Sequence, residues 1–367
     1  MGIQIKAAVL RDNGGPLTIE SLTLDDPLDD EVLVRIMATG ICHTDHEVIS
    51  GNMPPQPPVV MGHEGAGIVE RVGSAINHVR PGDHVVLSFP SCGTCPACRS
   101  GIPVRCPDVI ALSLSGARTD GSGTLLDRSG KSVNGSFFGQ SSFASHALAR
   151  APNVVRIDKE IPFEIAAPLG CGIQTGAGTV INTLKPKAGS SIAIFGVGAV
   201  GMAAVMAARV AGCEKIVAVD AHASRLLLAR DLGATHIVDV NGLDLDEVVS
   251  AVGETDYSIE ASGNQQAINA AIRVIRINGC CAFLGVSKPG TTINVDHYHI
   301  LNSRTIVGVM QGDSNPQTFI PELIGLYLKG ELPLERIIKI FAFADINAAF
   351  DASISGTVIK PVLLMTS

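Results

Sequence analysis

Aromatic and charged side chains are scarce in this sequence. Its 367 residues include no tryptophan and three tyrosines, and 17% of them are charged. Platforms that stack nucleic-acid bases need aromatic side chains, and a phosphate-binding surface needs clustered Lys and Arg, of which the chain has no run. The net charge of −8 also disfavours attraction to an anionic membrane. We therefore expect neither a nucleic-acid nor a membrane partner.

A secretory signal and a convincing membrane span are also missing. The N-terminal stretch MGIQIKAAVLRDNGG has no apolar core and no small-residue cleavage site. Residues 165–184 and 188–208 are uncharged, but the first range contains a proline, polar residues and four glycines, and the second opens on a Gly-rich turn. We expect a cytoplasmic protein, whose nine cysteines stay reduced and available for metal binding.

The pattern of apolar and turn residues changes once along the chain, and the length of the chain suits two domains. Up to about residue 160, short β-rich runs such as EVLVRIMATG alternate with turn residues, as in a compact barrel; residues 113–136 form a polar, Gly/Ser-rich excursion. From about residue 173, short apolar runs alternate with helix-like segments, which predicts βαβ units and a parallel sheet. A helix near 316–332 and a last strand at VIKPVLLM follow. The predicted fold is α/β: a barrel-like domain interrupted by a doubly wound domain.

A dinucleotide-binding fingerprint occurs after this change of pattern. Gly196, Gly198 and Gly201 form G-x-G-x-x-G between a predicted strand and a predicted helix, with Val197 and Val200 inside the motif. Asp220 ends the next strand, 19 residues after Gly201. A carboxylate there accepts hydrogen bonds from ribose hydroxyls and repels a 2′-phosphate, which favours NAD over NADP; Arg225 would soften that preference. The alternative is a glycine cluster that serves packing alone.

Four cysteines stand within fifteen residues, in the segment CGTCPACRSGIPVRC. Cys92, Cys95, Cys98 and Cys106 have the spacing C-x2-C-x2-C-x7-C, which can close a tetrahedron of thiolates around Zn²⁺. A closed shell neither binds substrate nor activates water, so such a site is structural. Pro107 follows as in ferredoxins, but the seven-residue gap differs from the iron–sulfur spacing. The sequence favours zinc over an iron–sulfur cluster or free thiols.

Three further segments place cysteine or histidine beside glycine: GICHTDHE (40–47), GHEGAG (62–67) and GCGIQTGAG (170–178). A lone cysteine is more often a small buried hydrophobic residue than a metal ligand, and sequence spacing alone does not join the three segments into one site. The order of these segments along the chain, together with the other motifs, does suggest one site. The run GHEGAGIVERVGSAINHVRPGDHVV, then the four cysteines, GCGIQTGAG and GVGAVG resembles the zinc-dependent medium-chain alcohol dehydrogenases over essentially the whole chain.

The resemblance implies a fold and a reaction. The fold is a GroES-like β-barrel catalytic domain, residues 1–172 and 311–367, interrupted by a Rossmann NAD-binding domain, residues 173–310. The reaction is the reversible oxidation of a primary alcohol to its aldehyde, in which zinc lowers the pKa of the alcohol and hydride passes to NAD. Two zinc ions per chain, one catalytic and one structural, and a homodimer or homotetramer are expected.

The resemblance also assigns the site residues. Cys42, His63 and Cys171 hold the catalytic zinc, Glu64 lies behind it, and Asp45 orients His63. Thr44 takes the proton of the alcohol; where relatives carry a relay histidine this chain has Glu47, so Glu47, its neighbour His46 or water completes the relay. The residues assigned to the cofactor, besides the fingerprint and Asp220, are His43 and Lys360 at the pyrophosphate, Thr175 at the nicotinamide, and Arg225 and Val286.

The substrate class is suggested by two segments. FFGQSSFASHALA (137–149) and MQGDSNPQTFIPELIGLYLKG (310–330) resemble the aryl-alcohol, benzyl-alcohol and geraniol dehydrogenases. Phe137 and Phe138 would then wall the pocket, and the small Ser88 would widen it. The alternatives are that these phenylalanines are core residues of an enzyme for linear alcohols, or that the chain is a non-catalytic relative that binds zinc and dinucleotide.

Overall fold

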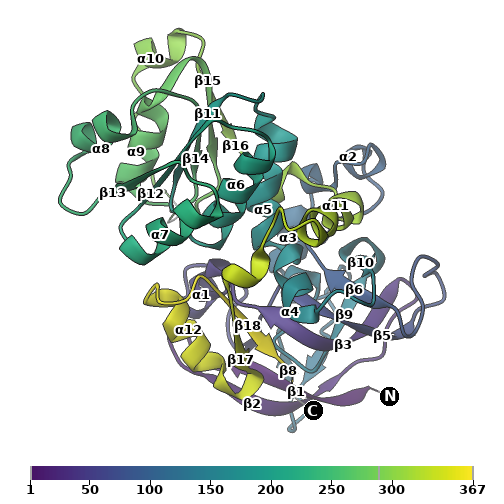
Figure 1. Ribbon diagram of the computed structural model, residues 1–367. Coiled ribbons are helices and arrows are strands. Elements are labelled where there is room, and N and C mark those ends of the chain that lie inside the picture. Colours follow the sequence, from purple (N-terminus) through teal and green to yellow (C-terminus); the bar gives the residue numbers. More distant parts are fainter. Residues whose placement is uncertain (1, 288–289, 366–367) are drawn as a thin grey trace. The chain divides into compact units, whose positions relative to one another are not determined.

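The computed structural model describes residues 2–287 and 290–365, and the chain divides into two compact units (Figure 1). The first unit comprises the chain up to Cys171, Asn315–Gly325 and the part from Leu334 on; the second comprises Gly172–Ser314 and Leu326–Pro333. Strands dominate the first unit, and strands alternating with helices make up the second. The predicted α/β fold, a β-rich part interrupted by a parallel-sheet part, is confirmed.

Two mostly antiparallel sheets build the first unit. In part of one strand, the buried Leu22 and Leu24 alternate with the half-buried Ser21 and Thr23, which is the period of two of a strand with one buried face. One sheet has the order β4 (Val59–Val60), β1 (Ile3–Leu10), β2 (Leu17–Leu24), β7 (Leu125–Leu126), β8 (Ser132–Val133). The other has the order β10 (Val154–Ile157), β6 (His84–Leu87), β5 (Gly65–Val72), β3 (Glu31–Gly40), β18 (Lys360–Leu364), β17 (Ile338–Ala342), with β9 (His146–Arg150) also on β3.

A six-stranded parallel sheet forms the centre of the second unit. Its order is β13 (His236–Asp239), β12 (Lys215–Asp220), β11 (Ser191–Phe195), β14 (Thr255–Glu260), β15 (Ile275–Phe283), β16 (Thr305–Gly308). The two strands β11 and β12 are almost continuously buried because helices cover the sheet. The helices packed against it are α6 (Ala199–Val210), α7 (Ala223–Leu232), α8 (Leu245–Val252) and α9 (Gln265–Arg273). The strand order reverses beside β11, where doubly wound folds bind ligands.

The remaining helices are short or lie outside that sheet. Five of them are short: α1 (His43–Ile49), α2 (Pro96–Arg99), α3 (Val109–Leu114), α4 (Phe163–Ala166) and α5 (Gly172–Gly178). The others are α10 (His297–Leu301), α11 (Pro316–Leu328) and α12 (Ile346–Ile354). None of the helices in the described part of the chain has both the length and the apolar character that crossing a bilayer requires.

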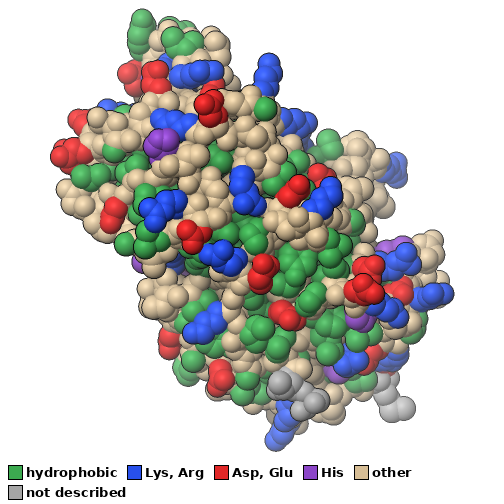
Figure 2. Space-filling model, in the orientation of Figure 1, with side chains coloured by type: hydrophobic (Ala, Val, Ile, Leu, Met, Phe, Trp, Pro, Cys, Tyr) green, Lys and Arg blue, Asp and Glu red, His purple; other side chains and the backbone are tan. Residues whose placement is uncertain are grey.

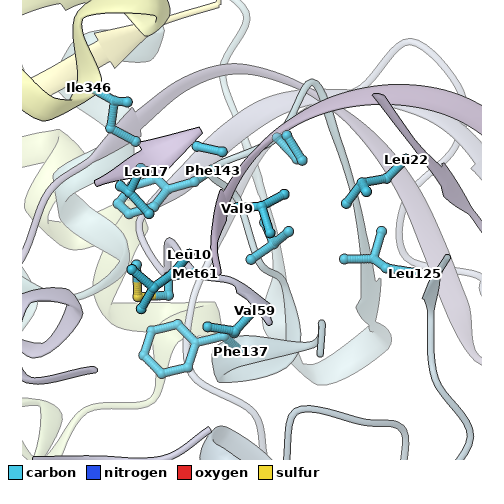
Figure 3. Packing of buried hydrophobic residues seen from close by; sticks show 14 of the residues in the cluster. Val9, Leu10, Leu17, Leu22, Val59, Met61, Leu125, Phe137, Phe143 and Ile346 are labelled. Atoms are coloured by element: carbon cyan, nitrogen blue, oxygen red, sulfur yellow. The ribbon is translucent and has the colours of Figure 1, made fainter. Parts of the chain in front are cut away.

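A large apolar core in the first unit fixes the strands that lead to the metal ligands. Figure 3 shows Val9 and Leu10 of β1 together with Val59, Met61 and Phe137, all fully buried. Burying one such side chain contributes about 1.5–3 kcal/mol. Because Met61 lies two residues before His63, the same packing holds the segment that carries this histidine.

The polar segment at residues 113–136 is anchored to the rest of the first unit by an ion pair and by two short strands. Arg118 is nearly buried and donates to both carboxylate oxygens of Glu31, at 2.8 and 2.9 Å, and to Asp25 at 2.7 Å. The strands β7 and β8 within it extend the first sheet. The anchoring pair is separated by 87 residues, so composition alone does not reveal it.

Candidate metal centres and dinucleotide site

The four cysteines of residues 92–106 converge. Their sulfur atoms all lie within 4.8 Å of one another. Cys95 begins helix α2, and the sulfurs accept backbone N–H groups along the loop: Cys92 from Cys95 at 3.3 Å, and Cys95 from Cys98 at 3.5 Å. Such donors stabilise thiolates, the form of cysteine that binds metal. The loop therefore supplies a closed set of four sulfurs that suits structural zinc.

The acid–base properties of this cluster also call for a cation. Hydrogen bonds from the backbone of Thr94 and Cys95 lower the pKa of Cys92 to about 6. Burial, in contrast, raises the pKa of Cys106 to about 12. Neighbouring like charges resist joint ionisation, so a bound cation is what allows all four to be thiolates.

Cys42, His63 and Cys171 come together from three distant segments. Their ligand atoms also lie within 4.8 Å of one another. Cys42 immediately precedes α1, His63 lies between β4 and β5, and Cys171 follows a 3₁₀ turn, Ala167–Gly170. His63 Nε2 is buried and lacks a hydrogen-bond partner of good geometry among the described residues. A buried, unpartnered ring nitrogen beside two sulfurs is the donor set of a three-residue zinc site with an open position.

The two cysteines of this cluster affect each other's pKa in opposite directions. The hydrogen bond from the Cys171 thiol holds the pKa of Cys42 well below its usual range, and the same contact with Cys42 raises the pKa of Cys171 well above it. One thiolate is thus already favoured where a metal ligand must be deprotonated. The residues present fit zinc.

Asp45 joins two of the ligand segments. Its Oδ1 accepts from His63 Nδ1 at 3.0 Å and from the backbone N–H of Gly62 at 3.1 Å, and its Oδ2 accepts from the backbone N–H of Cys42 at 3.0 Å. The carboxylate is fully buried. It directs Nε2 of His63 toward the sulfurs by holding the other ring nitrogen, as carboxylates do beside metal-bound histidines.

Glu64 and Lys360 form a buried ion pair beside these ligands. Lys360 Nζ donates to the two carboxylate oxygens of Glu64 at 3.0 and 2.9 Å and to the Ile41 carbonyl at 3.0 Å. Burial raises the pKa of Glu64 to about 7, although Lys360 opposes that shift. The sequence-based expectation put Lys360 at the cofactor pyrophosphate. In the structure the ammonium is 2% exposed and has three acceptors inside the first unit. Its contact with the pyrophosphate stays a prediction.

Helix α1 carries the residues expected to move a proton. Thr44 Oγ1 lies 3.8 Å from Cys42 Sγ. Glu47 accepts from Asn52 Nδ2 at 3.0 Å, and its other oxygen lies 3.2 Å from the exposed His43 ring nitrogen Nε2. His46 is half-buried, and burial lowers its pKa. The structure thus brings Glu47 and His43 together and leaves His46 outside that pair.

The two phenylalanines and the serine expected in the pocket differ in exposure. Phe138 is half-buried and stacks on the His63 ring, with centroids 4.6 Å apart. Phe137 and Ser88 are fully buried, Phe137 within the apolar core and Ser88 with its hydroxyl on the Gly170 carbonyl at 2.8 Å. Their place in the wall of a substrate pocket stays a prediction; in the structure, neighbouring atoms cover both side chains.

A tightly wound loop aims Phe138 at His63. Ser136, Phe138 and Ser141 all have φ between 48° and 55°, a region that costs side-chain-bearing residues about 1–3 kcal/mol each. Buried hydrogen bonds offset that strain: Ser141 Oγ donates to the Val60 carbonyl at 2.7 Å, and Gln140 accepts from the Gly65 N–H at 3.0 Å. Sequence reasoning missed Gln140. Its one signal was a long amide side chain inside an otherwise small and apolar segment.

The G-x-G-x-x-G segment has the backbone that a dinucleotide turn requires. Gly196 has φ +85°, and a Cβ there would lie 2.8 Å from Ser262 Cβ. A Cβ on Gly201 would collide with the Gly196 carbonyl oxygen, whereas the same atom on Gly198 would meet open space. The first and third glycines are therefore needed for the turn and for packing, and the second leaves room for a ligand.

Asp220 is held at the carboxyl end of β12 beside that turn. Its Oδ2 accepts from the Val197 backbone N–H at 2.8 Å, and its Oδ1 accepts from both the backbone N–H and Nδ1 of His222, at 2.9 and 2.8 Å. These three donors fix the carboxylate where a ribose hydroxyl is expected. His222 was not singled out from the sequence, because it precedes α7 without any motif of its own.

Four other residues expected at the cofactor lie in the second unit. Arg225 is half-buried, and its Nε lacks a hydrogen-bond partner in the part of the chain that the structure describes. Thr175 Oγ1, in α5, lies 3.5 Å from Gln311 Oε1. Val200 is half-buried in the first turn of α6, and Val286 is 44% exposed.

Comparison with known proteins gives a consistent result. Residues 28–159 match the model of the alcohol dehydrogenase GroES-like domain, and residues 199–328 match that of zinc-binding dehydrogenases. Geraniol dehydrogenase of Castellaniella defragrans is 41% identical over 99% of this chain and 98% of its own length. Among solved structures, benzyl alcohol dehydrogenase from Acinetobacter calcoaceticus is 40% identical, with a TM-score of 0.95, over 99% of this chain and all of that one.

A second solved structure agrees. An alcohol dehydrogenase zinc-binding domain protein from Burkholderia ambifaria is 44% identical, with a TM-score of 0.96, over the full length of both chains. Both metal clusters and the dinucleotide turn lie within this shared length. The chain therefore belongs to the zinc-dependent alcohol dehydrogenases, an enzyme family whose cofactors are zinc and NAD.

Proposed function

We propose that this enzyme reversibly oxidises a primary aromatic or allylic alcohol, of the benzyl alcohol or geraniol type, to the aldehyde with NAD. The observation that carries the proposal is the open cluster of Cys42, His63 and Cys171 beside the ring of Phe138. Relatives named for geraniol and benzyl alcohol, similar over nearly the whole chain, support the substrate class. Their aldehydes are conjugated, which makes the oxidation easier.

The residues of the chain divide the work. When bound, zinc polarises the alcohol oxygen and NAD accepts the hydride. Cys42, His63 and Cys171 hold the metal, Asp45 fixes the orientation of His63, and the four cysteines from Cys92 to Cys106 hold the structural ion. In the second unit, the glycine turn and Asp220 bind the dinucleotide, together with Thr175, Arg225 and Val286.

The proton of the alcohol leaves through helix α1. Thr44 relays it: Oγ1, which lies next to the ligand Cys42, accepts the proton of the alcohol while the hydroxyl releases its own proton toward Glu47. Glu47 is the terminal base in this proposal, because its carboxylate is held by Asn52 and lies 3.2 Å from the exposed His43. Glu47→Gln is expected to lower kcat at low buffer concentration, with recovery when a small exogenous base is added.

Initial rates of nicotinamide reduction test the substrate class directly. Benzyl alcohol, geraniol and ethanol are compared, each with NAD and with NADP, on protein shown to carry two zinc ions per chain. We expect the highest kcat/KM for benzyl alcohol or geraniol with NAD. A preference for ethanol would overturn the substrate class and leave the reaction intact. Absence of turnover in fully metallated protein would overturn the reaction itself.

We also propose the domain boundaries, the cellular compartment and the oligomeric state of the enzyme. We place residues 1–172 and 311–367 in the catalytic domain and residues 173–310 in the NAD-binding domain. The enzyme acts in the cytoplasm as a homo-oligomer. Thiolate clusters that need reduced cysteine support the compartment, and β16 at the edge of the parallel sheet supports strand pairing between copies. Sedimentation velocity of the purified protein tests the assembly, and a monomer would overturn it.

A further inference from the structure

A buried hydroxyl lies next to the backbone of one metal ligand. Ser88 Oγ donates to the carbonyl oxygen of Gly170 at 2.8 Å, and Gly170 is the residue before Cys171. Ser88 is 0% exposed and directly follows β6. The one polar group of this side chain is therefore used on the segment that carries Cys171.

A buried amide continues the connection to a second ligand. Gln140, which is 2% exposed, donates from Nε2 to the carbonyl of His63 at 3.0 Å and to that of Ser88 at 3.4 Å. Its Oε1 accepts from the N–H of Gly65 at 3.0 Å. A continuous path thus runs from the His63 backbone through Gln140 and Ser88 to the residue beside Cys171.

The same two segments are in direct backbone contact. A Cβ placed on Gly170 would collide with the carbonyl oxygen of Leu87, so the turn before Cys171 lies against the end of β6. Packing sets the separation of the segments, and the directional hydrogen bond from Ser88 sets their register. Asp45 already joins Cys42 to His63; the Ser88–Gln140 path joins His63 to Cys171.

We propose that Ser88 and Gln140 are positioning residues of the catalytic metal site. Neither belongs to the set of metal-ligating side chains. Together they fix where the sulfur of Cys171 stands relative to the ring nitrogen of His63. The inference rests on the proposed function only in taking this cluster as the holder of the catalytic zinc. It also gives Ser88 a role other than widening a pocket.

Zinc release from the folded enzyme tests this without any alcohol present. Release into a chromophoric chelator is followed for the wild type and for Ser88→Ala, and the phase that belongs to the catalytic site is identified as the one missing from Cys171→Ser. Loss of a residue that orients metal ligands weakens metal binding about 10- to 100-fold. We expect Ser88→Ala to accelerate the catalytic-site phase by about 10-fold or more, while the phase of the four-cysteine site is unchanged.

Cobalt supplies a spectroscopic readout that folding alone does not move. With Co²⁺ in the catalytic site, Ser88→Ala and Gln140→Met are expected to shift the visible absorption bands that report ligand geometry. Ser88→Thr retains the hydroxyl and is expected to restore both the spectrum and the release rate. Ser258→Ala is the matched control, because Ser258 is a fully buried serine that donates to a carbonyl, Ala271, at 2.6 Å in the second unit.

The outcomes separate the possibilities. Unchanged release and an unchanged cobalt spectrum in both Ser88→Ala and Gln140→Met would overturn the proposal. Equal acceleration of both release phases with a lower unfolding midpoint would also overturn it, because that is general destabilisation. Faster loss from the catalytic site in a protein that oxidises none of the alcohols would support this inference and refute the proposed function.

Discussion

Lys360 holds both carboxylate oxygens of Glu64 from the opposite end of the sequence, at 3.0 and 2.9 Å and across 296 positions. The pair is buried on both sides, with side chains 2% and 0% exposed. Lys360 donates to the carbonyl of Ile41, the residue before Cys42, and Glu64 is the residue after His63. The pair therefore borders two of the metal-ligand segments. It thus ties the last strand, β18, to the catalytic cluster.

Removing one partner of this pair should be costly. Lys360→Met leaves the buried carboxylate of Glu64 without its cation, and breaking a buried ion pair in this way costs about 3–5 kcal/mol in the free energy of unfolding. Chemical denaturation of the zinc-loaded protein measures it. The double variant Lys360→Met/Glu64→Gln should recover most of the loss. The exposed Lys187→Met is the control, expected within about 0.5 kcal/mol of the wild type. Equal effects of Lys187→Met and Lys360→Met would contradict the prediction.

The two cysteine clusters should lose their metals independently. Cys98→Ser and Cys171→Ser are each expected to reduce the zinc content from two ions per chain to one, as measured by elemental analysis. Cys98→Ser should lower the thermal unfolding midpoint more, because the binding energy of a structural metal is folding energy. Cys171→Ser should abolish turnover and retain a near-native midpoint. A variant that still binds two zinc ions would show that its cysteine is not a ligand.

The structural zinc loop and the glycine turn could be predicted from the sequence because each is a local pattern. Cys92 to Cys106 span fifteen residues, and the turn at Gly196 follows its strand directly. Strand β3 occupies the EVLVRIMATG run from end to end, because a β-rich run bounded by turn residues marks it. The α/β class followed from the change of pattern near residue 173.

The catalytic metal cluster could not be predicted from a local sequence pattern. Cys42, His63 and Cys171 are brought together by long-range strand pairing, so only the resemblance to a known family joined them. The ion pair of Lys360 was missed for the same reason: a lysine far from Glu64 in sequence carries no sign that this buried glutamate will accept its hydrogen bonds. Ser88 was read as a small side chain, and its hydrogen bond to Gly170 becomes visible only when β6 is packed against the turn before Cys171.

Asp220 should govern dinucleotide binding. Its carboxylate accepts three N–H donors from Val197 and His222. Asp220→Asn replaces one acceptor oxygen by a donor and removes the charge, and losing a hydrogen bond to a charged group weakens binding about 10-fold or more. Fluorescence titration with NADH and NADPH measures this without turnover. The preference for NADH over NADPH should fall as well.

A matched control for that change lies on the neighbouring strand. Asp239 is the parallel-register partner of Asp220, is exposed, and accepts from Asn241. Asp239→Asn should leave NADH affinity within about 2-fold, since exposed surface changes have small effects. Similar loss of affinity in both variants would remove the special role of Asp220.

Phe138 should determine the preference for aromatic alcohols. Its ring stacks on His63 with an interplanar angle of 27°, so it borders the metal site with one face. Phe138→Ala removes an aromatic partner worth about 0.5–1.5 kcal/mol beyond its buried area. We expect kcat/KM for benzyl alcohol to fall about 10-fold, while kcat/KM for ethanol changes little.

Phe163→Ala is the matched control. Phe163 is also half-buried and packs on a histidine, His84, with ring centroids 4.6 Å apart. His84 does not belong to the catalytic metal cluster. Phe163→Ala should change the unfolding midpoint and leave the ratio of benzyl alcohol to ethanol efficiency as in the wild type. If Phe138→Ala also preserves that ratio, the aromatic selectivity resides elsewhere in the enzyme.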